Sequence, residues 1–234
     1  MIAARLALGA AAAWATYTWG AHLLAPGCVS RGPRTHRRIA LTFDDGPDPV
    51  WTERVLTVLD RERVRASFFL VGERAARTPE TVRRIAAAGH EIGSHGWSHR
   101  SLWLCGPRRT EDEIVRGQRF LSDAAGAPIR HFRPPWGMLN AAMFGALRRH
   151  NQRCVLWSIQ PEGLRATPPV RQVEHVLDRA HPGAIVDLHD AEGVRDAPER
   201  LLVALPPMIG GLRRLGYDLV TVGELLDTAT IAPS

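Results

Sequence analysis

Two adjacent carboxylates, Asp44 and Asp45, stand where a short apolar segment meets a turn. Residues 39–43 have the composition of a buried strand, and Gly46-Pro47 ends it at once. Neighbouring side chains on a strand point to opposite faces, so the two carboxylates can converge on one point only where the strand is ending. One of them could then ligate a metal while the other acts as a base. On its own, the same run is equally typical of a solvated turn.

A pair of histidines favours the chemical interpretation. His95 and His99 lie four residues apart, about fifty residues after the carboxylates, and follow another short apolar segment at 91–93. Imidazole nitrogens combined with carboxylate oxygens are ligands typical of Zn²⁺ and related metals. The sequence therefore predicts a metal centre that combines the two histidines with one of the two carboxylates.

Strands and helices alternate from residue 39 onwards, and together they must position these side chains. The predicted strands are Ile39–Phe43, Ala66–Leu70, Glu91–Gly93, His131–Arg133, Arg153–Trp157, Ala184–Leu188 and Asp218–Thr221. The predicted helices are Trp51–Glu62, Pro79–Ala88, Thr110–Ala125, Ala141–His150, Pro169–Ala180, Pro198–Leu215 and Val222–Thr228. Seven strands, each followed by a helix, favour a parallel α/β architecture with a barrel-like closure. In such a barrel the chemistry gathers at the C-terminal ends of the strands, where Asp44, His95 and His189 all fall.

Composition limits the classes of function. The chain has 234 residues, 45% of them hydrophobic, which is enough for the core of one α/β domain. Its net charge is +6, but the basic residues, all arginine, form no run interleaved with aromatic residues. We therefore expect no nucleic-acid binding. The cysteines, Cys28, Cys105 and Cys154, are odd in number and form no Cys-x-x-Cys pair, so they indicate neither a disulfide framework nor a zinc knuckle.

The amino-terminal segment has a different composition from the rest. Residues 6–26 are apolar and rich in alanine, and are long enough to cross a bilayer once or to serve as a signal sequence. The alternative is an amphipathic helix lying on the domain. The run Leu24–Cys28 weakly resembles a lipoprotein cleavage site. We divide the chain into a hydrophobic signal or anchor segment with a basic linker (1–37), a catalytic domain (38–228) and a tail (229–234), and expect an exported or membrane-anchored envelope protein.

Four motifs at the ends of predicted strands resemble those of the polysaccharide deacetylases of the NodB-homology type (carbohydrate esterase family 4). They are Thr42-Phe43-Asp44-Asp45-Gly46, His95-x-x-x-His99, Arg133-Pro134-Pro135-Trp136-Gly137 and Leu188-His189-Asp190. The resemblance covers about residues 38–228. It implies a distorted (β/α)7 barrel, here preceded by a hydrophobic helix, and a divalent metal, usually zinc, with Co, Ni or Mn as alternatives. It also implies hydrolysis of N-acetyl or O-acetyl groups on a polysaccharide or oligosaccharide such as chitin or peptidoglycan.

The resemblance and the chemistry of the side chains together assign roles. Asp45, His95 and His99 would hold the metal, which polarises the acetyl carbonyl and lowers the pKa of a bound water. Asp44 would take the proton of that water as general base. Arg133 resembles the family's arginine that orients this base; a solvated charge at a strand end is the alternative.

The remaining roles concern the substrate. His189 would protonate the leaving amine as general acid. Pro135 stiffens a loop on which the backbone N–H of Trp136 could face the developing oxyanion. The ring of Trp136 could stack on a sugar. Leu188 would form part of the pocket for the acetyl methyl group.

One motif departs from the family's pattern. Where an aspartate-rich stretch ending in Asp-Trp is expected, this chain has Gln160, Gly163 and Leu164. The family's carboxylate there keeps the acid histidine protonated, so its loss puts the rate and the substrate in question. Glu162 or Asp190 could supply the missing charge.

Two further functions stay open beside a metal-dependent carbohydrate deacetylase. One is the hydrolysis of another C–N bond, such as that of a cyclic amide, by the same metal chemistry. The other is a catalytically inactive sugar-binding protein of the envelope. The presence of a base together with a full ligand set argues against the latter. The sequence does not indicate whether the protein forms oligomers.

Overall fold

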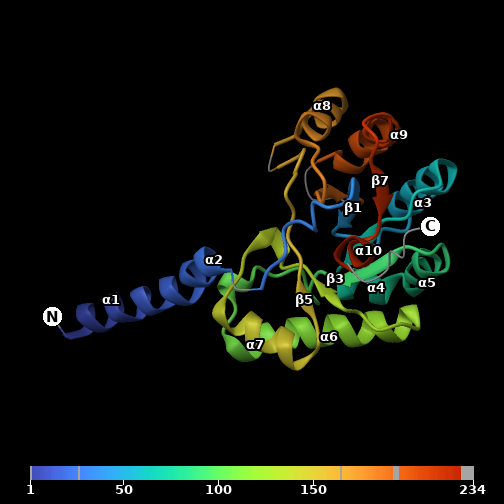
Figure 1. Ribbon diagram of the computed structural model, residues 1–234. Helices are drawn as coiled ribbons and strands as arrows, with labels where there is room; N and C mark the ends of the chain where they lie inside the picture. The colour runs from blue at the N-terminus through green and yellow to red at the C-terminus, as the bar shows by residue number, and fades with distance from the viewer. Residues whose placement is uncertain (1, 26, 164, 192–194, 228–234) are drawn as a thin grey trace.

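A seven-stranded parallel sheet forms the centre of the protein in a computed structural model, which describes all residues except 1, 26, 164, 192–194 and 228–234 (Figure 1). The strands are β1 (Arg38–Asp44), β2 (Ser67–Leu70), β3 (Glu91–Ser94), β4 (His131–Phe132), β5 (Arg153–Cys154), β6 (Ile185–His189) and β7 (Asp218–Val220). They run in the order β5-β4-β3-β2-β1-β6, and β7 pairs with β1. The seven predicted strands are confirmed, with β4 and β5 shorter than expected.

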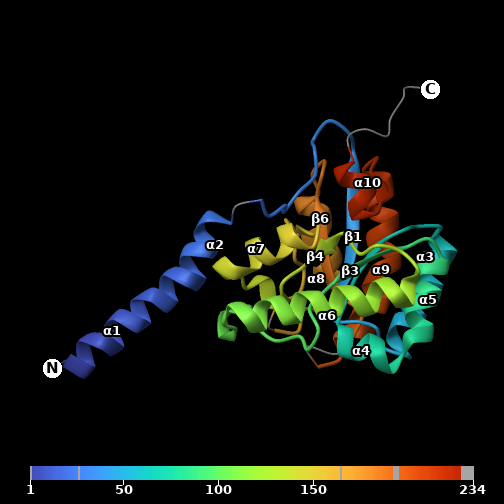
Figure 2. The same cartoon turned by 90° about the horizontal axis from the view of Figure 1, so that it is seen from below.

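Helices surround the outside of this curved sheet (Figure 2). They are α3 (Trp51–Glu62), α4 (Gly72–Arg77), α5 (Pro79–Ala87), α6 (Pro107–Ala125), α7 (Ala141–Arg149), α8 (Pro169–Arg179), α9 (Ala197–Arg214) and α10 (Val222–Leu226). All of the predicted helices are present, and the short α4 is an addition. Asp48 Oδ1 accepts hydrogen bonds from the backbone nitrogens of Val50 and Trp51, each at 2.8 Å, and so caps the start of α3.

The sheet curls into a half-barrel rather than closing strand to strand. Isolated bridges span the open side between β5 and β6: Val29 pairs with Val155, Arg31 with Ala184, and Ile159 with Val186. The backbone that precedes β1 thus bonds to both edges of the sheet. This pairing satisfies backbone groups that an open sheet edge would leave free.

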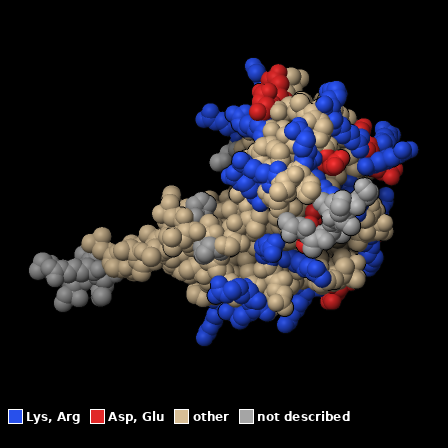
Figure 3. Space-filling view, viewed as in Figure 1, with Lys and Arg blue, Asp and Glu red and all other residues tan. Residues whose placement is uncertain are grey.

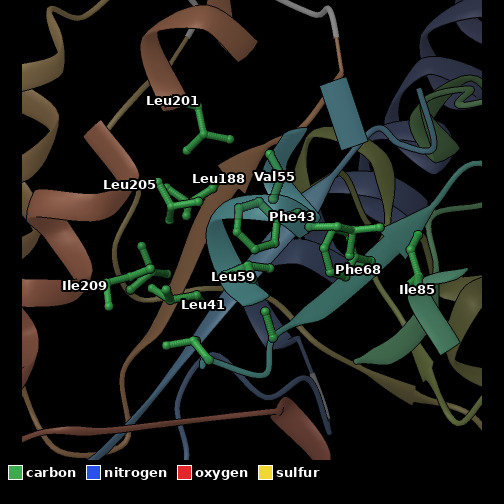
Figure 4. Close-up of a cluster of buried hydrophobic side chains, with 14 of the residues drawn as sticks. Leu41, Phe43, Val55, Leu59, Phe68, Ile85, Leu188, Leu201, Leu205 and Ile209 are labelled. Carbon is green, nitrogen blue, oxygen red and sulfur yellow. The ribbon is translucent and has the colours of Figure 1, made fainter. Parts of the chain in front are cut away.

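The main core lies between the sheet and the helices α3, α5 and α9 (Figure 4). Phe43 of β1 stacks on Phe68 of β2 with ring centroids 4.9 Å apart, and Leu188 of β6 packs in the same cluster. Side chains alternate along a strand, so the strand that sends Phe43 into this core sends Asp44 to the other face. The core therefore fixes the register that presents the polar side chains.

The amino-terminal segment projects from the domain as α1 (Ile2–Ala15), a short π-helix η1 (Thr16–Gly20) and α2 (Ala21–Leu24). It meets the domain where Trp19 packs on Trp103, with ring centroids 4.9 Å apart, and where the Tyr17 hydroxyl donates to the carbonyl of Cys105 at 3.2 Å. Figure 3 shows charged side chains over the globular part, whereas the tan part of the projection shows none on the face in view.

Within the described residues, no helix is both long and apolar enough to span a bilayer. The membrane anchor and the division of the chain into segments stay predictions. The tail at residues 229–234 lies outside the described residues.

Candidate active site

The first strand brings both carboxylates to one point. Asp44 ends β1, and Asp45 leaves the strand with a φ of 73°, in the left-handed region. Both are buried, and both approach the same nitrogen: Asp44 Oδ2 lies 3.8 Å and Asp45 Oδ1 3.6 Å from His95 Nε2. The expected convergence is confirmed. The left-handed turn at Asp45, a conformation costly for a residue other than glycine, accompanies it, as is common at functional sites.

Asp45, His95 and His99 form a set of potential metal ligands. Their ligand atoms all lie within 4.8 Å of one another, and His99 Nε2 is 2.8 Å from Asp45 Oδ1. The Nδ1 atom of His95 lies 2.8 Å from the carbonyl oxygen of Arg133, which can only accept a hydrogen bond. That bond places the proton on Nδ1 and leaves the Nε2 lone pair facing the carboxylates, as metal-binding histidines require.

The electrostatics of these three residues suit a cation. Burial, followed by the charge of His99, lowers the pKa of His95 to about 3, so its imidazole is neutral at physiological pH. Burial acts to raise the pKa of Asp45, but a hydrogen bond from His99 and the electrostatic effect of the two neighbouring imidazoles hold it below its usual value. One anionic oxygen and two imidazole nitrogens, with room left for water and substrate, fit Zn²⁺ well.

Arg133 holds the remaining carboxylate. Its side chain is 0% exposed, and Nη1 donates to Asp44 Oδ1 at 2.6 Å and to Thr42 Oγ1 at 2.8 Å. The carbonyl oxygens of Val155 and Leu156 accept from its Nε and Nη2. Because Oδ1 of Asp44 is fixed in this way, Oδ2 remains directed toward His95. The alternative of a solvated arginine at a strand end is wrong.

A third buried carboxylate, Asp187, joins this cluster. Its Oδ1 lies 3.3 Å from Arg133 Nη1, and a side-chain hydrogen bond joins it to Asp44. Burial raises the pKa of Asp44 to about 8 and that of Asp187 to about 7, although the Arg133 charge opposes both shifts. Two acids beside one guanidinium share a proton more readily than both ionise.

The prediction that Leu188 forms part of the acetyl pocket is wrong, and its neighbour Asp187 lies there instead. Leu188 is buried in the main core opposite Phe43 and is not among the described residues that line the cavity, so it does not form the acetyl pocket. Asp187 lines the cavity instead. Strand alternation could have revealed this, because Asp187 lies two residues before His189 and so on the same face.

A cavity of about 470 Å³ opens above these groups. The lining residues include Asp44, Asp45, Arg74, His95, His99, Trp136, Trp157, Gln160, Glu162, Gly163, Asp187 and His189. Trp136 is 51% exposed, with a φ of 54°, and the centroid of its ring lies 4.4 Å from that of His99. Pro135 is buried beside it in the 3₁₀ turn η3 (Pro135–Gly137). The tryptophan thus presents a rigid aromatic face at the rim.

Neither candidate for the missing carboxylate makes a hydrogen bond or ion pair with His189 among the described contacts. Glu162 Oε1 accepts from Arg200 Nε at 2.9 Å and from the backbone nitrogen of Thr167 at 3.0 Å. Asp190 Oδ2 accepts from Thr52 Oγ1 at 2.5 Å. A Cβ at Gly46 would lie 2.7 Å from both Asp190 oxygens, so Asp190 packs against that turn. Leu164, the last position of the altered motif, lies outside the described residues.

Comparison with known proteins identifies the family. The model of the polysaccharide deacetylase family matches residues 31–155. The chain belongs to the polysaccharide deacetylase family.

Two relatives of this deacetylase illustrate its class, that of carbohydrate deacetylases. A peptidoglycan-N-acetylglucosamine deacetylase of Bacillus cereus is 37% identical over 83% of this chain and 90% of its own length. A chitooligosaccharide deacetylase of Bradyrhizobium is 35% identical over 81% of this chain and 90% of its own length.

Solved structures of related proteins share the curled barrel of this deacetylase. The Bc1960 peptidoglycan N-acetylglucosamine deacetylase superposes with a TM-score of 0.82 at 29% identity, covering 90% of this chain and 97% of that one. A mutant pseudoenzyme of carbohydrate esterase family 4 with restored activity superposes with a TM-score of 0.79 at 26% identity, covering 86% and 72%. The distorted (β/α)7 barrel is confirmed. Because the same fold includes a pseudoenzyme, activity must be argued from the side chains.

Proposed function

We propose that this deacetylase hydrolyses N-acetyl groups on amino-sugar units of a cell-envelope polysaccharide, peptidoglycan foremost, with a divalent metal, most simply zinc. The arrangement of Asp44 is the observation that carries the proposal. One oxygen is fixed by Arg133 at 2.6 Å, and the other faces the ligand cluster, 3.8 Å from His95 Nε2. A carboxylate held beside a ligand set, yet outside it, is positioned to act as a base.

Each residue then has a distinct task. Asp45, His95 and His99 would hold the metal, which supplies Lewis-acid chemistry to the acetyl carbonyl and to water. Asp44 accepts the proton of the attacking water on its Oδ2 atom. Arg133 keeps the Asp44 carboxylate oriented throughout. His189, at the end of β6 and on the cavity wall, donates a proton to the nitrogen of the leaving amine.

The rim of the cavity suits a sugar polymer. The exposed face of Trp136 can stack on a pyranose ring, which presents apolar C–H groups to aromatic side chains. The backbone N–H of Trp136 is the proposed donor to the oxyanion that develops on the acetyl oxygen. The relatives named above act on peptidoglycan N-acetylglucosamine and on chitooligosaccharides. Both substrates contain N-acetylated sugar units, and both belong in a substrate panel.

Export to the envelope accompanies this proposal. Peptidoglycan lies outside the cytoplasmic membrane, and the apolar segment at residues 6–26 has the composition of a signal or anchor. Fractionation of cells that express the full chain would test it. Recovery in the cytoplasmic fraction would contradict it.

A combined assay of metal and product tests the function. We expect the purified protein to retain stoichiometric metal and to release acetate from N-acetylglucosamine oligomers or peptidoglycan, with Asp45→Ala losing both properties. Metal with turnover of cyclic amides, but no acetate from sugars, would instead assign the other C–N hydrolase. Binding of the sugars without any turnover, at full metal occupancy, would assign an inactive sugar-binding protein.

A further inference from the structure

Two of the three cysteines lie side by side across the open side of the half-barrel. Val29 pairs with Val155 in a parallel bridge, with Val29 N donating to the carbonyl of Cys154 at 2.9 Å and Leu156 N donating to the carbonyl of Val29 at 2.7 Å. One residue before each member of this pair stands a cysteine, Cys28 on one segment and Cys154 at the end of β5. Residues in register on neighbouring parallel strands point to the same face, about 4.8 Å apart.

That spacing suits a covalent bond. Disulfides join residues whose Cα atoms are about 4.4–6.8 Å apart and whose Cβ atoms face each other. Cys28 packs against the hydrophobic cluster that contains Cys154, and both are thiols in the structure. A hydrogen bond between the two side chains, which lowers the pKa of Cys28, is a further sign of their contact. We propose that Cys28 and Cys154 form a disulfide that fixes segment 27–31 to β5 and holds the open side of the barrel closed.

The two thiols have unequal roles in forming the bond. The Cys154 thiol donates a hydrogen bond to Cys28, which stabilises the Cys28 thiolate, and its own pKa is raised well above the usual value by that bond and by burial. Cys28 is half-buried and therefore more accessible, whereas Cys154 is 3% exposed. Cys28 is thus the thiol that attacks an external disulfide first.

The oxidation is an ordinary thiol–disulfide exchange. The Cys28 thiolate attacks one sulfur of a disulfide oxidant, such as oxidised glutathione or an envelope dithiol oxidase, and the first leaving thiolate takes up a proton. Cys154 then loses its proton and attacks the Cys28 sulfur, releasing the second thiol. The cysteines together lose two electrons and two protons, and the oxidant gains both. An exported domain meets such oxidants outside the cytoplasm.

The bond would act on the architecture of the site rather than on its chemistry. Val155 and Leu156, directly after Cys154, supply the carbonyl oxygens that hold the guanidinium of Arg133. Arg31, three residues after Cys28, bridges to Ala184 beside β6. Fixing segment 27–31 therefore ties together the two edges between which the catalytic side chains lie.

Peptide mapping of the full chain gives a direct test. The protein is incubated with oxidised glutathione, alkylated in denaturant and digested with trypsin without reduction. We expect the peptide of residues 6–31 to be joined to the peptide of residues 154–165, with Cys105 alone alkylated. Three alkylated cysteines, or a link through Cys105, would overturn the proposal. So would a mature protein that is cleaved before Cys28 and carries lipid on it.

Thermal unfolding tests the structural role. A loop of this size closed by a disulfide is expected to raise the midpoint by about 5–15 °C relative to the reduced protein. Cys28→Ser should abolish this difference between oxidised and reduced samples, and the matched control Cys105→Ser should keep it. An equal midpoint for the linked and reduced wild-type protein would show that the bond fixes nothing.

Discussion

Replacing Asp187 by asparagine isolates the effect of one buried charge on the proposed base. Asp44 and Asp187 bind the same nitrogen of Arg133 at 2.6 and 3.3 Å, so the two bound oxygens are at most about 6 Å apart. At that separation and an effective dielectric constant of about 20, two carboxylates repel each other by about 3 kcal/mol, or about 2 pKa units. Asparagine keeps the size and an oxygen acceptor for Arg133 but removes the repulsion.

The sign of the expected shift follows from the requirement that a base be ionised. Asp187 raises the pKa of Asp44 and Arg133 lowers it. Asp187→Asn should therefore move the acidic limb of the kcat/KM profile to lower pH by about 1–2 units. Arg133→Gln should move the same limb to higher pH. Opposite shifts from two neighbours in one cluster would be difficult to obtain from a general loss of structure.

The assay is acetate release from an N-acetylglucosamine oligomer at saturating metal, over about pH 4 to 9. Asp190→Asn is the matched control, because it removes another buried carboxylate of the site region that is bound to Thr52 and not to Arg133. Its shift should be smaller. If Asp187→Asn leaves the limb in place, the charge of Asp187 does not control the ionisation of Asp44, and the electrostatic coupling of the two carboxylates is refuted.

Three further outcomes are expected. Asp44→Asn should leave the metal bound while turnover falls by roughly 10²-fold or more, whereas alanine at Asp45, His95 or His99 should remove the metal. Plasma emission spectrometry measures the metal content, and acetate release measures the turnover. Loss of metal in Asp44→Asn would show that Asp44 is itself a ligand. Burial raises the pKa of Asp190 to about 7, above an unfolded value near 3.8, so its contribution to stability is complete below about pH 3.8 and is lost as the pH rises toward 7. Asp190→Asn should accordingly raise the melting temperature relative to wild type more at pH 8 than at pH 5, and an equal effect at both would show that the group does not titrate in this range. Glu162→Gln should leave the alkaline limb of the rate profile unmoved because Arg200 holds that carboxylate, while His189→Ala should abolish turnover. A clear shift of the limb in Glu162→Gln would show that Glu162 acts on His189 after all.

Local pattern was sufficient to predict most of the fold. The apolar runs at β1 and β2 and the amphipathic stretches at α3 and α6 have the periodicities of buried strands and half-buried helices, and the structure places them within a few residues of the prediction. The helix α4 was not predicted because six residues are too few to show a helical periodicity. The bridge between Val29 and Val155 was not predicted because a pairing of residues so distant in sequence leaves no local signal.

The site was predictable where the chemistry was unusual and unpredictable where it depended on packing. Adjacent aspartates before a Gly-Pro turn and histidines four apart are rare enough to stand out, and the structure gathers three of these four residues into one ligand set. The partners of a buried charge are a different matter. That Glu162 is bound by Arg200, and Asp187 by Arg133, depends on which side chains the finished barrel brings together.

The altered fourth motif and the extra carboxylate are best understood together. Gln160 and Gly163 line the cavity at positions where the family's pattern has carboxylates, and Asp187 adds one on the wall formed by β6. The site therefore retains negative charge, but the charge is bound to Arg133, the residue that also holds Asp44. In this arrangement the protein controls the base through a shared guanidinium and leaves His189 without a carboxylate partner among the described hydrogen bonds and ion pairs. Proton uptake by Asp44 then depends on a balance within this cluster: burial and the charge of Asp187 raise its pKa, and the charge of Arg133 lowers it.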